Sequence, residues 1–259
     1  MSDPEDAARA ALRERQGAGA RYDAAAAPHA DLVWARRGTA YFARKLNELA
    51  DNELDQPSLV DGWNRRQVAA HVGYHARALS RLVDWARTGV ETPMYASEEQ
   101  HAEEVASGAT LPSRALRNLF HHTEVHLNVE WRDLTDQGWD AVVRDDAGRD
   151  LPIRRTPFLR AREVWVRAVD LDNGGSFRDF PPEFLDRLRD EIVAGWSASG
   201  EGPDLVLAAS DRSETVSIGS GAGPTVSGRQ ADLVRWMTGR GTAGVASSAG
   251  ELPALPLHR

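Results

Sequence analysis

Residues 64–89 read NRRQVAAHVGYHARALSRLVDWARTG and predict one long helix with a clear start and a clear end. Asn64 and Gln67 have the spacing of a capping box, in which each side chain binds the backbone of the other residue. Gly89 is the expected C-terminal stop, because glycine readily adopts the left-handed conformation that ends many helices. The apolar residues between these signals recur at helical spacing, so one face of the helix is predicted to be buried.

Three other stretches predict long helices. Residues 30–51 carry an apolar stripe, a helix is expected to begin near Ser113, and Thr156 followed by proline begins another. A shorter helix is predicted after Ser97, with Gln100 at the capping spacing. Over residues 139–154 the apolar residues no longer recur at helical spacing, which suggests a small hairpin. Four substantial helices with one interruption fit an antiparallel bundle.

The composition changes after Gly174 and Gly175, where a second, smaller domain is predicted. It should contain two helices around three short strands. The predicted helices are 181–196 and 229–239, and the predicted strands are 204–209, 214–219 and 224–228. The fold class is therefore α+β, with an N-terminal extension over 1–29, a helical bundle over 30–175 and an α/β domain over 176–259.

The composition excludes several classes of function. A net charge of −8 argues against nucleic acid as the main partner, because phosphate binding needs a concentrated basic surface. No apolar run is long enough to span a membrane, and the N-terminus lacks the apolar core of a signal peptide, so a cytoplasmic protein is expected. The chain has no cysteine, so any thiol chemistry must use a small-molecule thiol.

Residues 162–172 read REVWVRAVDLD and place two ionisable side chains in one of the most apolar stretches of the chain. Glu163 and Arg167 are spaced to share one face of a helix, where such a pair is normally solvated and weakly stabilising. Buried ionisable groups require a compensating partner. This stretch therefore predicts a functional or structural role for both side chains.

Histidines occur twice at the i, i+4 spacing that lets two imidazoles bind one metal. For His122 and His126 we favour a partly solvated helix face. His71, followed by His75, lies on or beside a predicted buried stripe, and Glu163 could meet it inside the bundle. Arg167 cannot be a further ligand, since a guanidinium has no lone pair to offer.

Several segments together resemble the mycothiol-dependent maleylpyruvate isomerases of actinobacteria. The resemblance extends from about residue 34 to the end, and the segments that carry it are SLVDGWNRRQVAAHVGYHARAL (58–79), WARTGVETPMY (85–95), LRNLFHHTEVHLNVEWR (116–132), REVWVRAVDL (162–171) and LVRWMTGRGTAGVASSAGELP (233–253). It implies a DinB-like four-helix bundle followed by a small α/β domain. It also implies zinc and mycothiol as cofactors, with His71 and Glu163 as two of three zinc ligands.

The activity that this resemblance implies is the conversion of maleylpyruvate to fumarylpyruvate, with the thiol as a reversible nucleophile, in aromatic catabolism. Arg240 is then the residue expected to bind a carboxylate of the small anionic substrate. From its position alone, Arg240 could equally be a helix C-terminal cation between two glycines. A mycothiol S-transferase and a non-catalytic binding module are the alternative functions.

The third zinc ligand of the family maps onto position 167, where this chain has arginine. One hypothesis is that His75 replaces the missing ligand and completes a set with His71 and Glu163. A second is that the zinc site is weakened or lost, and that Arg167 pairs with Glu163 or binds an anion. A third is that Arg167 is an introduced change in an ordinary isomerase.

Overall fold

The computed structural model describes residues 22–256, so most of the predicted extension over 1–29 lies outside the described residues. The chain divides into two compact units. The helical unit contains the chain up to Pro57 and Gly62–Val164, and the sheet unit contains Ser58–Asp61 and the chain from Trp165 onward. This division falls inside a helix, earlier than residue 175, so the predicted domain boundaries remain predictions.

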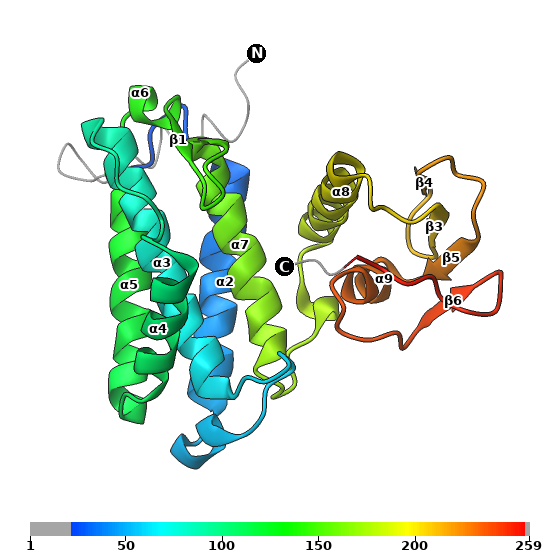
Figure 1. Cartoon of the computed structure of the whole chain (residues 1–259), viewed down its shortest axis with the longest axis horizontal. Helices are drawn as coiled ribbons and strands as arrows, with labels where there is room; N and C mark the ends of the chain where they lie inside the picture. Colours follow the sequence, from blue (N-terminus) through cyan, green and yellow to red (C-terminus); the bar gives the residue numbers. More distant parts are fainter. Residues whose placement is uncertain (1–21, 257–259) are drawn as a thin grey trace, which may run out of the picture. The chain divides into compact units, whose positions relative to one another are not determined.

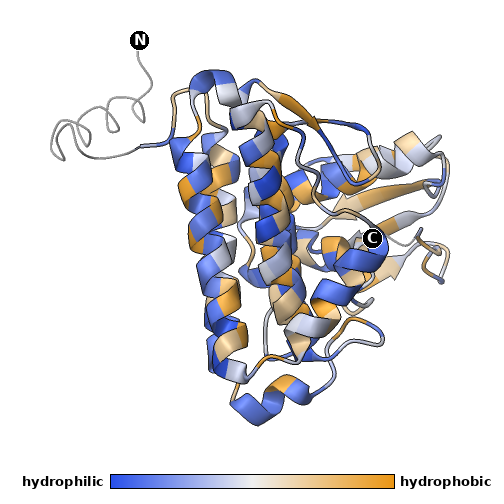
Figure 2. Ribbon diagram, turned by 60° about the vertical axis from the view of Figure 1, so that its left-hand side comes forward, coloured by the Kyte–Doolittle hydropathy of each residue, from blue (hydrophilic) through white to orange (hydrophobic). Residues whose placement is uncertain are grey.

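Four long helices lie side by side in the bundle, and a shorter helix packs against one of them (Figure 1). The long helices are α2 (His29–Glu48), α3 (Arg65–Thr88), α5 (Ser113–Asp133) and α7 (Thr156–Asp170), and the shorter one is α4 (Glu98–Ala109). Blue and orange residues alternate along the long helices in Figure 2, as expected of amphipathic helices with one buried face. The predicted bundle is therefore confirmed.

The local signals for α3 and α4 are confirmed. Asn64 and Gln67 form the capping box, and Gly89 ends α3 in the left-handed conformation with a φ of 73°. Ser97 accepts a hydrogen bond from the backbone N–H of Gln100 at the start of α4. The first helix was expected to reach residue 51, but α2 ends at Glu48 and a 3₁₀-helix, η1 (Asp51–Asp55), follows it.

A close approach fixes α4 against α3. A Cβ atom built on Gly108 of α4 would lie 2.7 Å from Cε2 of Tyr74 and 3.0 Å from Cβ of Ala70, both on α3. A larger residue at position 108 would force Tyr74 to move and would crowd Ala70, so glycine suits this spacing. The close packing holds α4 over the part of α3 that carries the histidines.

The predicted hairpin is formed by β1 (Val142–Arg144) and β2 (Asp150–Pro152), which pair antiparallel after the short helix α6 (Asp136–Trp139). A 3₁₀ turn, η2 (Ile153–Arg155), leads from β2 into α7. Trp139 and Ile153 are completely buried, so the hairpin is anchored to the core of the helical unit.

The sheet unit contains four strands in the order β4-β3-β5-β6, with helices α8 (Pro182–Ser199) and α9 (Gln230–Met237) and the 3₁₀ turn η3 (Phe177–Asp179). The strands are β3 (Leu205–Ala209), β4 (Thr215–Ile218), β5 (Thr225–Gly228) and β6 (Val245–Ser247). β3 and β5 are parallel, whereas the other pairs are antiparallel. The α+β class and the three predicted strands are confirmed, and β6 was not predicted.

Candidate functional site

Helices α3 and α7 bring His71 and Glu163 into direct contact. Nε2 of His71 lies 2.8 Å from Oε1 of Glu163, and the two side chains are only 13% and 11% exposed. His71 faces the interior because it follows the buried residues Val68 and Ala69 on the apolar side of α3. The predicted meeting of these two side chains inside the bundle is therefore observed.

His75 lies one turn further along α3 and is buried. Its ring centroid is 6.4 Å from that of His71. Burial lowers the pKa of His75 to about 3, although the charge of Glu163 opposes this shift. His75 is therefore neutral at pH 7, which is the form of imidazole that donates a lone pair to a metal.

His101 joins this group from α4, and sequence reasoning did not select it. Its ring centroid lies 5.2 Å from that of His71 and 4.0 Å from that of Tyr95. Burial lowers the pKa of His101 and raises that of Tyr95. Trp63 closes another side of His71, with their ring centroids 5.3 Å apart. No spacing rule connects His101 with His71, because the two residues belong to different helices.

The three imidazoles offer unused donor atoms. Within residues 22–256, Nδ1 of His71, His75 and His101 is buried and has no hydrogen-bond partner. Neutral imidazoles and a carboxylate are the ligand types of a catalytic zinc site. In the described part of the chain, however, no group of three or more His, Cys, Asp or Glu residues is arranged to hold a metal ion. The donor types fit zinc, but the side chains would have to move to surround it.

Arg167 and Arg240 in the sheet unit bind one carboxylate, that of Asp170. Arg240 donates from Nε and Nη2 to Oδ1 and Oδ2 at 3.0 and 2.9 Å, and Nη1 of Arg167 donates to Oδ2 at 3.0 Å. The side chain of Asp170 is 0% exposed. Two guanidinium groups therefore share the carboxylate of Asp170. Asp170 was not selected from the sequence, because its position in an apolar stretch gave no sign of a partner so distant in sequence.

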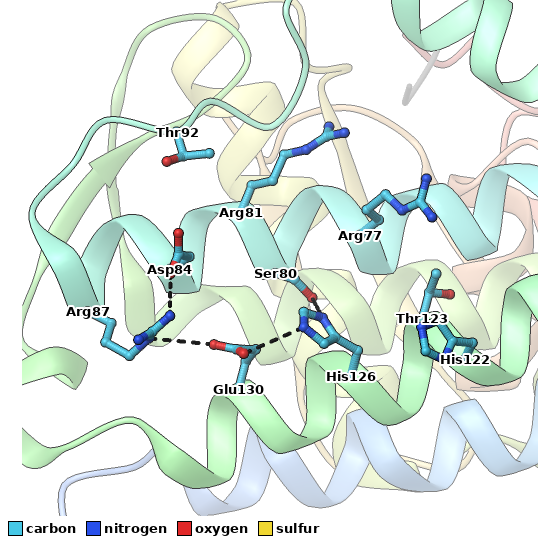
Figure 3. A pocket seen from close by; sticks show the side chains of 10 residues that line it. All are labelled: Arg77, Ser80, Arg81, Asp84, Arg87, Thr92, His122, Thr123, His126 and Glu130. Carbon is cyan, nitrogen blue, oxygen red and sulfur yellow. Dashed lines mark hydrogen bonds and ion pairs between the residues drawn. The ribbon is translucent and has the colours of Figure 1, made fainter.

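His122 and His126 line a cleft of about 430 Å³ between α3 and α5 (Figure 3). Nδ1 of His126 lies 3.3 Å from Oγ of Ser80, and its Nε2 lies 3.6 Å from Glu130. The side chain of His126 is 56% exposed. These contacts agree with the predicted solvated helix face and place this pair away from the group around His71.

The bundle, its buried histidine and glutamate pair, and the small mixed sheet define a class of protein. It is a four-helix bundle followed by a smaller α/β domain. Residues 35–172 match the family model described as the mycothiol maleylpyruvate isomerase N-terminal domain, and residues 179–257 match that of the MDMPI C-terminal domain. The chain belongs to the mycothiol-dependent maleylpyruvate isomerase family.

Solved structures agree with the family models. The crystal structure of a mycothiol-dependent maleylpyruvate isomerase is 41% identical to this chain, covers 89% of it and 97% of its own chain, and has a TM-score of 0.85. A second crystal structure, of a histidine-to-alanine mutant of such an isomerase, is 40% identical with the same coverage and TM-score. No curated protein sequence gave a significant match. No helix among residues 22–256 is both long and apolar enough to cross a membrane.

Proposed function

We propose that this chain is an enzyme that isomerises maleylpyruvate to fumarylpyruvate with mycothiol as its thiol. The observation that carries the proposal is the 41% identity over 89% of the chain to a crystallised isomerase of this name. The contact between His71 and Glu163 supports it, because these are two residues that the resemblance to the family implies as zinc ligands. The absence of cysteine agrees with the use of an external thiol.

The reaction can be written with its bonds balanced. A carbon–sulfur bond forms at the cis alkene, and the π electrons pass to the conjugated carbonyl oxygen. The former double bond then turns as a single bond, and loss of the thiolate restores the alkene in the trans form. No atom is gained or lost, so the substrate mass is unchanged and the free thiol returns.

His71 and Glu163 are the first two residues that we expect to hold a zinc ion, and His75 is the third. When bound, zinc would favour the thiolate form of the thiol at neutral pH. His75 suits this role because it is neutral and its Nδ1 is unpartnered within the described chain. His101 is the competing third donor, because its ring lies closer to His71 than the ring of His75 does.

Arg240 and Arg167 are the residues that we expect to bind the carboxylate groups of the substrate. Asp170 pairs with both guanidinium groups and so fixes the direction of both side chains. A planar guanidinium can also stabilise negative charge that develops on the enolate oxygen. In this proposal Asp170 is a positioning residue that does not touch the substrate.

The proposal is tested by incubating the purified chain with maleylpyruvate and mycothiol and analysing the products by mass spectrometry. Isomerisation predicts fumarylpyruvate of unchanged mass and complete recovery of free thiol. A product heavier by the mass of the thiol would instead identify an S-transferase. Absence of turnover with zinc and mycothiol both present would refute the proposal.

A further inference from the structure

Arg240 lies in a glycine-rich loop, residues 239–244, that follows α9 and leads to β6. Its three glycines, Gly239, Gly241 and Gly244, adopt left-handed backbone conformations with φ of 76°, 108° and 78°. Glycine has more conformational freedom than any other residue, so such a loop needs contacts with other elements to keep one shape. The position of Arg240 therefore depends on those contacts.

Arg235, in the last turn of α9, holds this loop at two points. Its backbone oxygen accepts a hydrogen bond of 3.0 Å from the N–H of Arg240, and its Nη2 donates to the backbone oxygen of Ala243. The side chain of Arg235 is 25% exposed, so the second contact is partly shielded from water. One residue thus holds the loop on both sides of Gly241.

Asp232, in the first turn of α9, is the acid beside Arg235. Its side chain is 7% exposed, and its Oδ1 lies 3.7 Å from Nη2 of Arg235. It also contacts the end of the loop, since a Cβ atom built on Gly244 would lie 2.7 Å from its Oδ2. Asp232 therefore contacts both Gly244 and the guanidinium that holds Ala243.

The shape of the loop matters because Arg240 has few donors left for a ligand. Within residues 22–256, its Nε and Nη2 donate to Asp170, and its Nη1 donates to the backbone oxygen of Thr238. Each Nη atom carries a second hydrogen, so one N–H remains on Nη1 and one on Nη2. These two N–H groups can bind both oxygens of a carboxylate only when the guanidinium faces it in one direction.

We propose that Arg235, together with Asp232, is a positioning residue for the isomerisation. It fixes the loop 239–244 and so the direction in which Arg240 meets a carboxylate of the substrate. Neither Arg235 nor Asp232 touches the substrate. This inference rests on the proposed function, in which Arg240 binds such a carboxylate.

The first test compares kcat/KM for maleylpyruvate, at saturating mycothiol, in Arg235→Gln, in Arg240→Lys and in the double variant. Arg235→Gln keeps the backbone contact with Arg240 and loses the side-chain contact with Ala243. We expect kcat/KM to fall about fivefold, because a displaced binding group holds the substrate poorly. In the Arg240→Lys background the same substitution should lower kcat/KM by less than about twofold, since both changes act on one contact. Additive effects overturn the proposal.

Arg178→Gln is the matched control. Arg178 pairs with the same Asp232, at 3.0 Å, but in the described chain it makes no hydrogen bond to residues 239–244. Its loss should leave kcat/KM within about twofold of the natural value. A fall as large as that in Arg235→Gln would mean that the ion pairs of Asp232 act through general stability, and it overturns the proposal.

Gly244→Ala reaches the loop from its other end and changes no charge. The added methyl group would collide with Asp232, so kcat/KM should fall as in Arg235→Gln. Gly200→Ala is the control for backbone strain, because Gly200 has a φ of 70° and no neighbouring atom within 4 Å of an added Cβ. It should keep the natural kcat/KM. Equal values in Gly244→Ala and Gly200→Ala overturn the proposal.

Urea unfolding of the same four chains tests the positioning without any activity. Arg240→Lys should lower the free energy of unfolding less in the Arg235→Gln background than in the natural chain, because the displaced loop has already weakened the contact with Asp170. Equal losses in the two backgrounds overturn the proposal. If the natural chain does not turn over maleylpyruvate but the losses differ, the proposed function is refuted and the positioning of Arg240 by Arg235 stands.

Discussion

Arg240 holds Asp170 from a position far along the chain, with Nε–Oδ1 and Nη2–Oδ2 distances of 3.0 and 2.9 Å. Asp170 is the last residue of α7, and its backbone oxygen accepts a hydrogen bond from Leu59. Asp170 therefore joins three segments of the sheet unit, because its backbone oxygen binds residues 58–61 and its carboxylate binds the loop after α9 to the end of α7. This contact is both a structural element and the support of the proposed substrate-binding arginines.

Asp170→Asn tests whether the contact between Arg240 and Asp170 stabilises the fold. The amide would leave two guanidinium groups without their carboxylate, and breaking a buried ion pair costs about 3 kcal/mol or more. We expect a loss of this size in the free energy of unfolding measured with urea. Asp190→Asn removes a carboxylate that pairs at the surface, with 56% of its side chain exposed, and should change stability by less than about 1 kcal/mol. Equal effects in the two variants would contradict this view of Asp170.

Arg240→Lys tests whether Arg240 binds a carboxylate of the substrate. Lysine keeps the positive charge but loses the two parallel donors, so it can hold neither Asp170 nor a substrate carboxylate in the same way. We expect KM for maleylpyruvate to rise about tenfold, which corresponds to about 1.4 kcal/mol of lost binding. Arg178→Lys is the control, because Arg178 also pairs with a buried aspartate, Asp232, but its own side chain is 60% exposed. Unchanged KM in Arg240→Lys would exclude substrate binding by this residue.

The sequence predicted those features that local signals encode. The capping box at Asn64, the stop at Gly89 and the hairpin before α7 each depend on a few neighbouring residues, and all are confirmed. Strand β6 was missed because it has three residues and becomes a strand only by pairing with β5. Its identity is therefore set by tertiary contacts rather than by its own pattern.

In the candidate site, too, some residues could be predicted from local sequence and others only from tertiary contacts. His71 and Glu163 could be paired from helical spacing and burial, because both lie on apolar faces of bundle helices. His101 and Asp170 could not, since each gains its role from a partner on another element. The burial of Arg160 on α7 gave no signal either, because an arginine in a helix is normally solvated. What the sequence lacked was the distance between side chains from separate helices.

Metal content distinguishes the hypotheses for position 167. If His71, His75 and Glu163 hold zinc, the natural chain purifies with near-stoichiometric zinc, and His75→Ala loses it. His101→Ala should then retain the metal, so the two alanine variants identify the third donor between them. Arg167→His should bind no more zinc than the natural chain. A large gain of both zinc and turnover in Arg167→His would show that the natural site is incomplete.

Glu124→Gln on α5 tests how burial of this carboxyl group affects stability at different pH values. Burial raises the pKa of Glu124 above its ordinary value of 4.5, although His121 and Arg160 oppose the shift. The folded state therefore holds this proton more tightly than the unfolded state does. Stability falls as pH rises from about 4.5 through the folded pKa, and the full cost is present at pH 7.

Glutamine imitates the protonated form, so Glu124→Gln should be more stable than the natural chain at pH 7, by up to about 1 kcal/mol. The difference should vanish below pH 4, where both side chains are neutral. Urea unfolding at several pH values checks this, with Glu48→Gln, at a more exposed glutamate, as the control expected to lack the gain. Equal stability of Glu124→Gln and the natural chain at pH 7 would contradict a raised pKa of Glu124.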